Sequence, residues 1–192
     1  MRLTFNNIQS AGFVASNAST VSLPKLWIGY ALAAAGFISS VVSSAGCVEE
    51  ANRAFAFFIR LLLLFGELYL MFCIYRIHRI VMVLTEGNYP ISPLGAVAGS
   101  YIPCYNLYWI YKWAREFAKF VNGGGYATML SGNLLGHIFV VSMIVSIKFG
   151  RGSGLAIDLV IANYMIGKLR PHIESRLFFQ VNRIEAGADG RI

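Results

Sequence analysis

An apolar stretch from Ala54 to Tyr75 constrains the chain more than any other feature, because it is long enough to cross a lipid bilayer. A crossing helix needs about 20 mostly apolar residues. The stretch also contains Arg60 and Glu67, which are seven positions apart and therefore share one face of a helix. We expect a membrane helix that carries two ionic side chains at bilayer depth.

The composition places the whole chain in the membrane class. Of its 192 residues, 57% are hydrophobic and only 13% are charged, whereas soluble domains have about 25% charged residues. The net charge of +7 is spread over several loops, where Lys and Arg contact lipid headgroups and orient the helices. This distribution predicts a lipid bilayer as a partner and no nucleic acid.

Five apolar runs predict an all-α, polytopic membrane protein with four to five transmembrane helices and two interfacial amphipathic helices. The fifth run is short for a crossing, so a re-entrant segment is its alternative. The second run can continue as a helix to Leu84, and Pro171 is expected to open the second amphipathic helix. The predicted spans are residues 26–48, 54–75, 91–111, 129–147 and 155–169, within a bundle (26–170) flanked by a polar N-terminal segment (1–25) and a C-terminal amphipathic segment (171–192).

Small residues recur at spacings of three and four along the predicted spans, which places them on single helical faces. Lipid supplies no hydrophobic drive between helices, so close backbone approach at small residues is one way for them to associate. Pro103 interrupts the third span and is expected to kink it. The predicted helix-packing residues are Gly29, Ala33, Gly36, Gly95, Gly99, Gly132 and Gly136.

The segment after the third span combines charged and aromatic residues with a helical period. Trp113 and Phe117 fall on one face, and the charged residues fall on the other. We expect an amphipathic helix that lies along the lipid headgroups. Its predicted membrane-surface residues are Lys112, Trp113, Arg115 and Lys119.

Four ionisable residues inside the spans form a predicted intramembrane polar cluster. A charge at the bilayer centre costs about 2.5–3.5 kcal/mol on insertion scales, so each of them needs a partner. Within the cluster, Arg60 and Glu67 could neutralise each other or pair with an adjacent subunit; in the alternative, Glu67 and His137 exchange a proton along an ion path. The four residues are Arg60, Glu67, His137 and Asp158.

Asp158 lies nearer a membrane face, where Arg151 or Arg79 could meet it. His137 has a further interpretation, because an intramembrane His preceded by Gly can be an axial ligand of a haem or chlorophyll-type pigment. A haem with two His ligands is not expected, since the other two histidines lie near the ends of spans. A polar contact between helices is the alternative for His137.

No catalytic motif, metal-ligand spacing or CxxC pair occurs in the chain. We therefore predict neither an enzyme nor a metal site. The three cysteines show no framework spacing and are expected to be reduced.

The segment from Ile102 to Trp109, IPCYNLYW, resembles a pattern in small uncharacterised bacterial multi-pass membrane proteins. In those proteins, a membrane helix carries Ile-Pro and then Asn-x-aromatic-Trp, and a charged amphipathic segment follows. The similarity extends over about residues 92–122. It implies a membrane architecture and supplies no reaction.

These features favour an accessory integral-membrane subunit of a larger complex, with other membrane subunits as partners in a hetero- or homo-oligomer. The alternatives are a proton-coupled transporter or channel that uses Glu67 and His137, and a pigment- or lipid-binding subunit. Bound lipids are expected, and a pigment is a further candidate ligand at His137. We expect a bacterial or organellar inner membrane, and the distribution of Lys and Arg predicts that the C-terminus lies in the cytoplasm or matrix.

Overall fold

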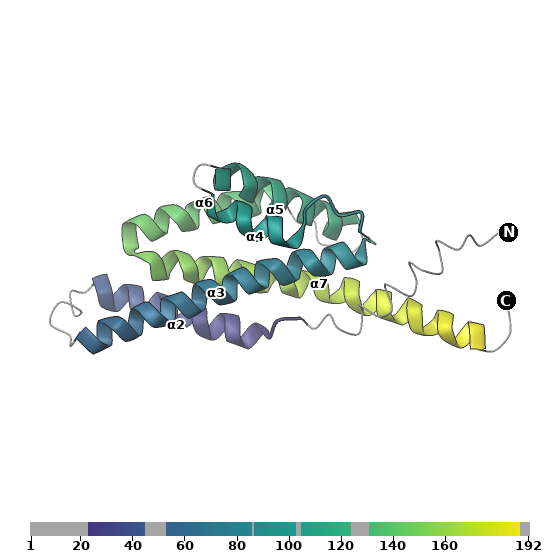
Figure 1. The fold of residues 1–192 in the computed structure, drawn as a ribbon, viewed down its shortest axis with the longest axis horizontal. Helices are drawn as coiled ribbons and strands as arrows, with labels where there is room; N and C mark the ends of the chain where they lie inside the picture. Colours follow the sequence, from purple (N-terminus) through teal and green to yellow (C-terminus); the bar gives the residue numbers. More distant parts are fainter. Residues whose placement is uncertain (1–22, 45–52, 86, 103–104, 124–130, 189–192) are drawn as a thin grey trace.

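A computed structural model describes residues 23–44, 53–85, 87–102, 105–123 and 131–188, and its regular structure there is entirely α-helical. The expected all-α class is confirmed for this part of the chain. α2, α3 and α7 run side by side, and α4, α5 and α6 lie above them (Figure 1). The helices, labelled as in Figure 1, are α2 (Leu26–Ser44), α3 (Arg53–Leu84), α4 (Pro93–Tyr101), α5 (Tyr105–Gly123), α6 (Gly132–Phe149) and α7 (Arg151–Ala188).

Three helical segments of the described chain are long and apolar enough to cross a membrane. α2 has 19 residues and α6 has 18, about 28 Å each at 1.5 Å per residue, which is close to the roughly 30 Å hydrocarbon core of a bilayer. α3 continues without interruption beyond the expected second span. The segments are Leu26–Ser43, Ala54–Leu84 and Gly132–Phe149, and residues 45–48 and 129–130 of the expected spans lie outside the described residues.

The central helix is α7, which packs on α2, α3 and α6. It follows α6 after Gly150 alone, whose φ of +92° is a conformation that favours glycine. The hydroxyl of Ser153 donates to the carbonyl oxygen of Gly150 at 2.7 Å and so stabilises this tight turn. The buried apolar side chains of α7 are Leu155, Ala156, Leu159, Ile161, Ala162, Met165, Ile166 and Leu169.

The expected third span, residues 91–111, is not a single helix. α4 ends before Ile102, whose backbone is extended (φ −79°, ψ 117°). The indole Nε1 of Trp109 donates to the carbonyl oxygen of Ala96 at 3.2 Å, although residues 13 positions apart in one helix are separated by about 20 Å. α4 and α5 therefore form a hairpin, and the prediction of one kinked crossing is wrong; Pro103 itself lies outside the described residues.

Pro171 lies inside α7, so the expected start of a new helix at this residue is wrong. The ring of a proline crowds the carbonyl group four residues before it. Here that carbonyl belongs to Gly167, whose surroundings are open, since an added Cβ would have no neighbour within 4 Å. The expected fifth run, residues 155–169, is the middle of a helix of 38 residues. This helix extends beyond the bundle at its C-terminal end (Figure 1).

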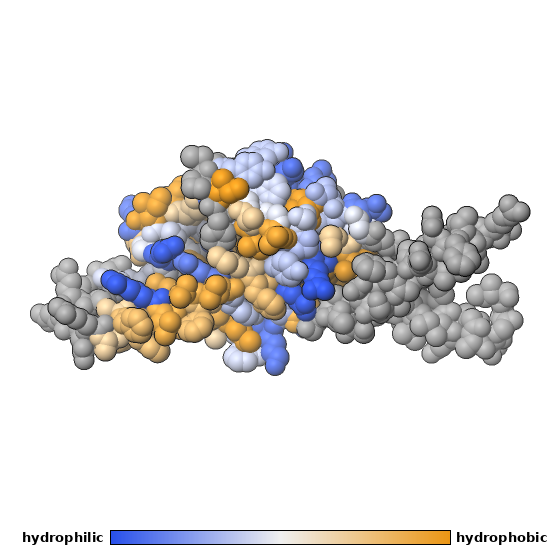
Figure 2. Space-filling view, viewed as in Figure 1, coloured by the Kyte–Doolittle hydropathy of each residue, from blue (hydrophilic) through white to orange (hydrophobic). Residues whose placement is uncertain are grey.

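The outer faces of α2, α3 and α6 are apolar and exposed. Figure 2 shows apolar side chains gathered along α3, with hydrophilic ones near its C-terminal end. Soluble monomers rarely expose apolar patches of more than a few hundred Å², so this surface is consistent with a membrane protein. Its members include Trp27, Phe37, Ile38, Phe57, Phe58, Phe65, Leu134, Ile144 and Ile147.

Candidate functional site

Glu67 forms an ion pair with Arg151 at the start of α7. The Nε atom of Arg151 lies 3.3 Å from Oε1 of Glu67, and the Arg151 side chain is 78% exposed. Arg60 is also exposed, and neither of the two ion pairs among the described residues includes it. The expected pair between Arg60 and Glu67 is therefore not formed.

Asp158 faces α6 and meets a hydroxyl group in place of the expected arginine. The hydroxyl of Ser142 lies 2.5 Å from Oδ1 of Asp158 and 2.9 Å from the carbonyl oxygen of Phe139, and can donate to either. Ser142 is buried, at 1% exposure, so the interaction lies inside the bundle. The predicted pair between Asp158 and Arg151 is wrong, because Arg151 binds Glu67.

His137 lies on the exposed side of α6. Its Nδ1 lies 2.6 Å from the carbonyl oxygen of Asn133, one turn earlier, and must donate to this acceptor. Its ring packs edge-on against Tyr111 of α5, with centroids 5.3 Å apart. The polar contact of His137 is therefore within α6, and its contact with another helix is the ring of Tyr111.

The predicted intramembrane cluster is thus divided among separate helix faces. α3, which carries Arg60 and Glu67, packs on α2, α4 and α7, whereas α6, which carries His137, packs on α5 and α7. Asp158 faces α6 and Glu67 contacts the first residue of α7. The structure therefore does not join Glu67 to His137.

The small residues of α2 lie against α7. An added Cβ at Gly36 would be 2.9 Å from the carbonyl oxygen of Gly152, and one at Gly29 would overlap the side chain of Asn163. Ala33, between them, is 5% exposed. The face that the spacing marks on α2 is therefore occupied within this chain.

The other small residues lie within or around the α4–α5 hairpin. An added Cβ at Gly132 would meet the backbone of α5 at 2.6 Å, and one at Gly136 would overlap Tyr111. Gly99 lies against the ring of Trp109, while Gly95 lies against the Ser92 hydroxyl that caps its own helix. These close approaches are also internal, so these glycines do not mark a free docking face.

α5 is amphipathic, but its apolar face covers the protein core. Trp113 and Phe117 are 2% and 0% exposed, so the prediction that Trp113 lies at the membrane surface is wrong. On the polar face, Arg115 donates to Oδ1 of Asn133 at 2.9 Å and Lys119 pairs with Glu116 at 2.6 Å. Lys112 lies over the rings of Tyr108 and Trp109.

A buried aromatic cluster, which the sequence analysis missed, joins α3 to the hairpin. The ring of His78 stacks on Tyr89 at 5.5 Å and meets Trp113 edge-on at 5.3 Å. Burial, with a further contribution from Glu116, raises the pKa of the Tyr89 phenol above its usual value. Since Tyr89 precedes α4 and Trp113 lies midway along α5, the start of the hairpin and the middle of its second helix meet at the same point of α3.

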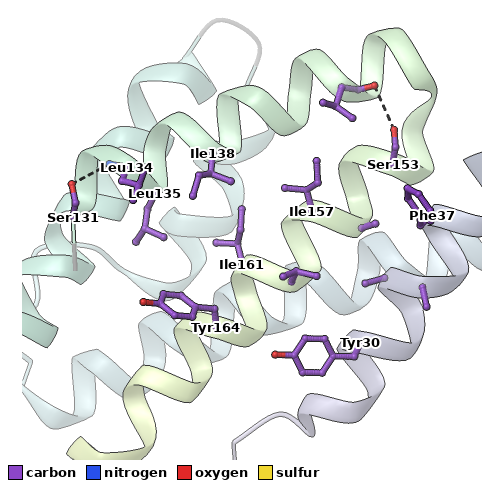
Figure 3. A pocket seen from close by; sticks show the side chains of 15 residues that line it. Tyr30, Phe37, Ser131, Leu134, Leu135, Ile138, Ser153, Ile157, Ile161 and Tyr164 are labelled. Atoms are coloured by element: carbon purple, nitrogen blue, oxygen red, sulfur yellow. Dashed lines mark hydrogen bonds between the residues drawn. The ribbon is translucent and has the colours of Figure 1, made fainter. Parts of the chain in front are cut away.

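An apolar groove of about 820 Å³ among the described residues is open to a ligand. α7 forms its floor, and α2 and α6 form its walls (Figure 3). No charged side chain lines it. The lining residues are Tyr30, Ala33, Ala34, Phe37, Ser131, Leu134, Leu135, Ile138, Val145, Ser153, Ala156, Ile157, Val160, Ile161 and Tyr164.

The two ends of this groove differ in polarity. Tyr30 and Tyr164 lie at the end near the start of α2, where the Nδ2 group of Asn163 donates to the carbonyl oxygen of Leu26 at 3.2 Å. One turn beyond, the Lys168 ammonium lies 5.3 Å from the ring centroid of Tyr164. The i, i+4 spacing of Tyr164 and Lys168 was the signal in the sequence that could have indicated this end.

Comparison of the chain with protein-family models, with curated proteins and with solved structures gives no match.

Proposed function

We propose that the protein is an integral-membrane protein that binds a lipid acyl chain in the groove between α2, α6 and α7. The observation that supports this most directly is the lining, which contains only apolar, tyrosine and serine side chains. The volume of about 820 Å³ also lies within the range of about 300–1,000 Å³ that is usual for ligand sites.

The length of the groove favours an acyl chain over a crossing helix of a partner. Along α7 the lining runs from Ser153 to Tyr164, which corresponds to about 16 Å. One leaflet contributes about half of the roughly 30 Å hydrocarbon core. The groove therefore matches the depth of one leaflet, whereas a crossing helix needs contacts over about twice that length.

The proposal places α2, α3, α6 and the first half of α7 across the bilayer, as four crossing helices. We include α7 because it packs on α2, α3 and α6, although its own sequence is less apolar. The C-terminal end of α7 then extends from the bilayer on the side that we assign to the cytoplasm or matrix, in a bacterial or organellar inner membrane.

A pair of variants on α2 tests the lipid site. Ala34 lines the groove and is exposed, while Ala31 is exposed on the same helix and does not line it. Ala34→Trp should fill the groove and remove a bound lipid without disturbing the core, and Ala31→Trp is the matched control. Native mass spectrometry of protein purified in mild detergent counts the lipids bound to each.

We expect wild type and Ala31→Trp to retain at least one lipid more than Ala34→Trp. Equal numbers of bound lipids on all three proteins would reject the groove as a lipid site. Unchanged thermal unfolding of the two variants would show that each is folded.

A role as an accessory subunit is the second candidate, favoured by Arg60. This residue lies exposed on α3 in register with the exposed apolar residues Phe57 and Leu64, where an acidic residue of a partner helix would satisfy it. Copurification from native membranes, with Arg60→Gln compared against Arg170→Gln, tests this role. Partner recovery that falls only for Arg60→Gln supports it, and a monodisperse monomer without partners counts against it.

A further inference from the structure

We infer that the lipid in the groove is an anionic phospholipid whose headgroup lies at the end marked by Tyr164 and Lys168. This inference rests on the proposed acyl-chain site and adds the class of lipid and its orientation. It commits to a membrane lipid, because the groove is open to the apolar surface of the bundle.

Lys168 lies beside one end of the groove. Its ammonium lies 5.3 Å from the ring centroid of Tyr164, and Tyr164 is itself part of the lining. Lys168 follows Tyr164 by one helical turn, so it stands just beyond the groove rather than within it. A phosphate group at the mouth could bind this cation while its acyl chain extends along the uncharged lining.

A second cation, at the start of α2, lies at the same end of the groove. α2 and α7 are antiparallel, since Gly29 lies against Asn163 and Gly36 lies against Gly152. Lys25 therefore precedes α2 at the end where Lys168 follows the groove, and it is exposed.

Two lining tyrosines, Tyr30 and Tyr164, also lie at this end of the groove. Both are about half exposed, and Figure 3 shows both rings at one end of the lining, with Phe37 at the other. Tyrosine is enriched at the level of lipid headgroups, where its ring is buried and its hydroxyl is hydrated. The two tyrosines therefore mark this end as the interfacial end, where Lys25 and Lys168 also lie.

The opposite end also has a nearby lysine, which provides a control. Lys148 lies three residues beyond the lining residue Val145, but its ammonium lies over the ring of Phe149, at 5.8 Å, and Phe149 does not line the groove. Lys148 should therefore not contact a lipid in the groove.

The experiment measures which lipid the full chain selects. Protein is equilibrated with mixed micelles of equal amounts of phosphatidylglycerol and phosphatidylcholine with identical acyl chains. Native mass spectrometry then gives the amounts of the two lipids bound to each variant. The amounts bound to Ala34→Trp, in which the groove is filled, are subtracted before the ratio is taken. An interfacial lysine near an anionic headgroup should favour the anionic lipid by about fivefold.

We expect wild type and Lys148→Gln to prefer phosphatidylglycerol, and Lys168→Gln to lose about fivefold of that preference. Lys25→Gln should have an effect of the same sign. A lipid ratio near one for wild type, or an equal loss for Lys148→Gln and Lys168→Gln, overturns the inference while the groove remains a lipid site. If Ala34→Trp retains as much lipid as wild type, both the acyl-chain site and this inference are rejected.

Discussion

The Nε atom of Arg151 lies 3.3 Å from Oε1 of Glu67, so the first residue of α7 is joined to the middle of α3. At its N-terminal end α3 extends beyond the α6–α7 turn (Figure 1). This pairing also supplies the partner that an acidic residue in an apolar helix requires.

A double-mutant cycle should detect this ion pair. We expect Glu67→Gln and Arg151→Gln each to lower the free energy of unfolding, and the double variant to lose less than their sum. Because Arg151 is 78% exposed, the coupling should be no more than about 1 kcal/mol, as for surface ion pairs. Thermal or denaturant unfolding in detergent at low ionic strength measures it.

Arg60 provides the control for this cycle. It lies seven residues before Glu67 on the same helix, and the structure shows no ion pair between them. Additive effects of Glu67→Gln and Arg60→Gln are therefore expected. Coupling of Glu67 to Arg60 and none to Arg151 would contradict the observed pairing.

The sequence revealed that these ionic residues need partners but not which partners they have. Spacing along one helix places Arg60 and Glu67 on one face, yet the register between helices decides what lies opposite. That register depends on close contacts such as Gly36 on Gly152, which involve both helices at once. A single helix pattern therefore could not predict that Arg151 meets Glu67, nor that three helices combine to form the groove.

Two glycines of α7 should respond in opposite ways to substitution by alanine. An added Cβ at Gly152 would overlap the carbonyl oxygen of Gly36, whereas one at Gly167 has no neighbour within 4 Å. Gly152→Ala should therefore destabilise the bundle by about 1–3 kcal/mol through overpacking. Gly167→Ala should be neutral or stabilise it by up to about 1 kcal/mol, because alanine restricts the unfolded chain.

Unfolding of the two variants in the same detergent provides the comparison. Equal changes in the free energy of unfolding for Gly152→Ala and Gly167→Ala would show that α2 and α7 do not approach as closely as the structure describes. Gly152→Ser would add a second measurement, since it introduces the same Cβ with a polar atom.

Because α4 and α5 form a hairpin, we predict that the segments before α4 and at the end of α5 are accessible from the same side of the membrane. Asn88 precedes α4 and Asn122 lies at the end of α5, and both are exposed. In a variant without native cysteines, Asn88→Cys and Asn122→Cys should react with a membrane-impermeant maleimide from the same side of the membrane. A single crossing by residues 91–111 would place them on opposite sides, and labelling in intact and opened vesicles distinguishes the two cases.

The expected third span illustrates how an apolar run can mislead. Residues 91–111 form an apolar run from which we expected a crossing. In the structure, Tyr89 and Trp113 both contact the ring of His78, and the indole of Trp109 donates to the carbonyl oxygen of Ala96. These are contacts between distant residues, and hydropathy carries no information about them. The long, continuous runs of α2, α3 and α6 were predictable because their local pattern alone decides the helix.

Proton flux should not depend on Glu67 and His137 together. The two residues lie on α3 and α6, which both pack on α7, and each already has another partner: Arg151 for Glu67 and the Asn133 carbonyl for His137. A direct proton exchange between them has no path in this arrangement. In vesicles that contain a pH-sensitive dye, wild type, Glu67→Gln and His137→Gln should therefore give the same flux under an imposed potential. A loss of flux in both single variants, with no further loss in the double variant, would instead place them on one proton path and require the helices to rearrange around α7.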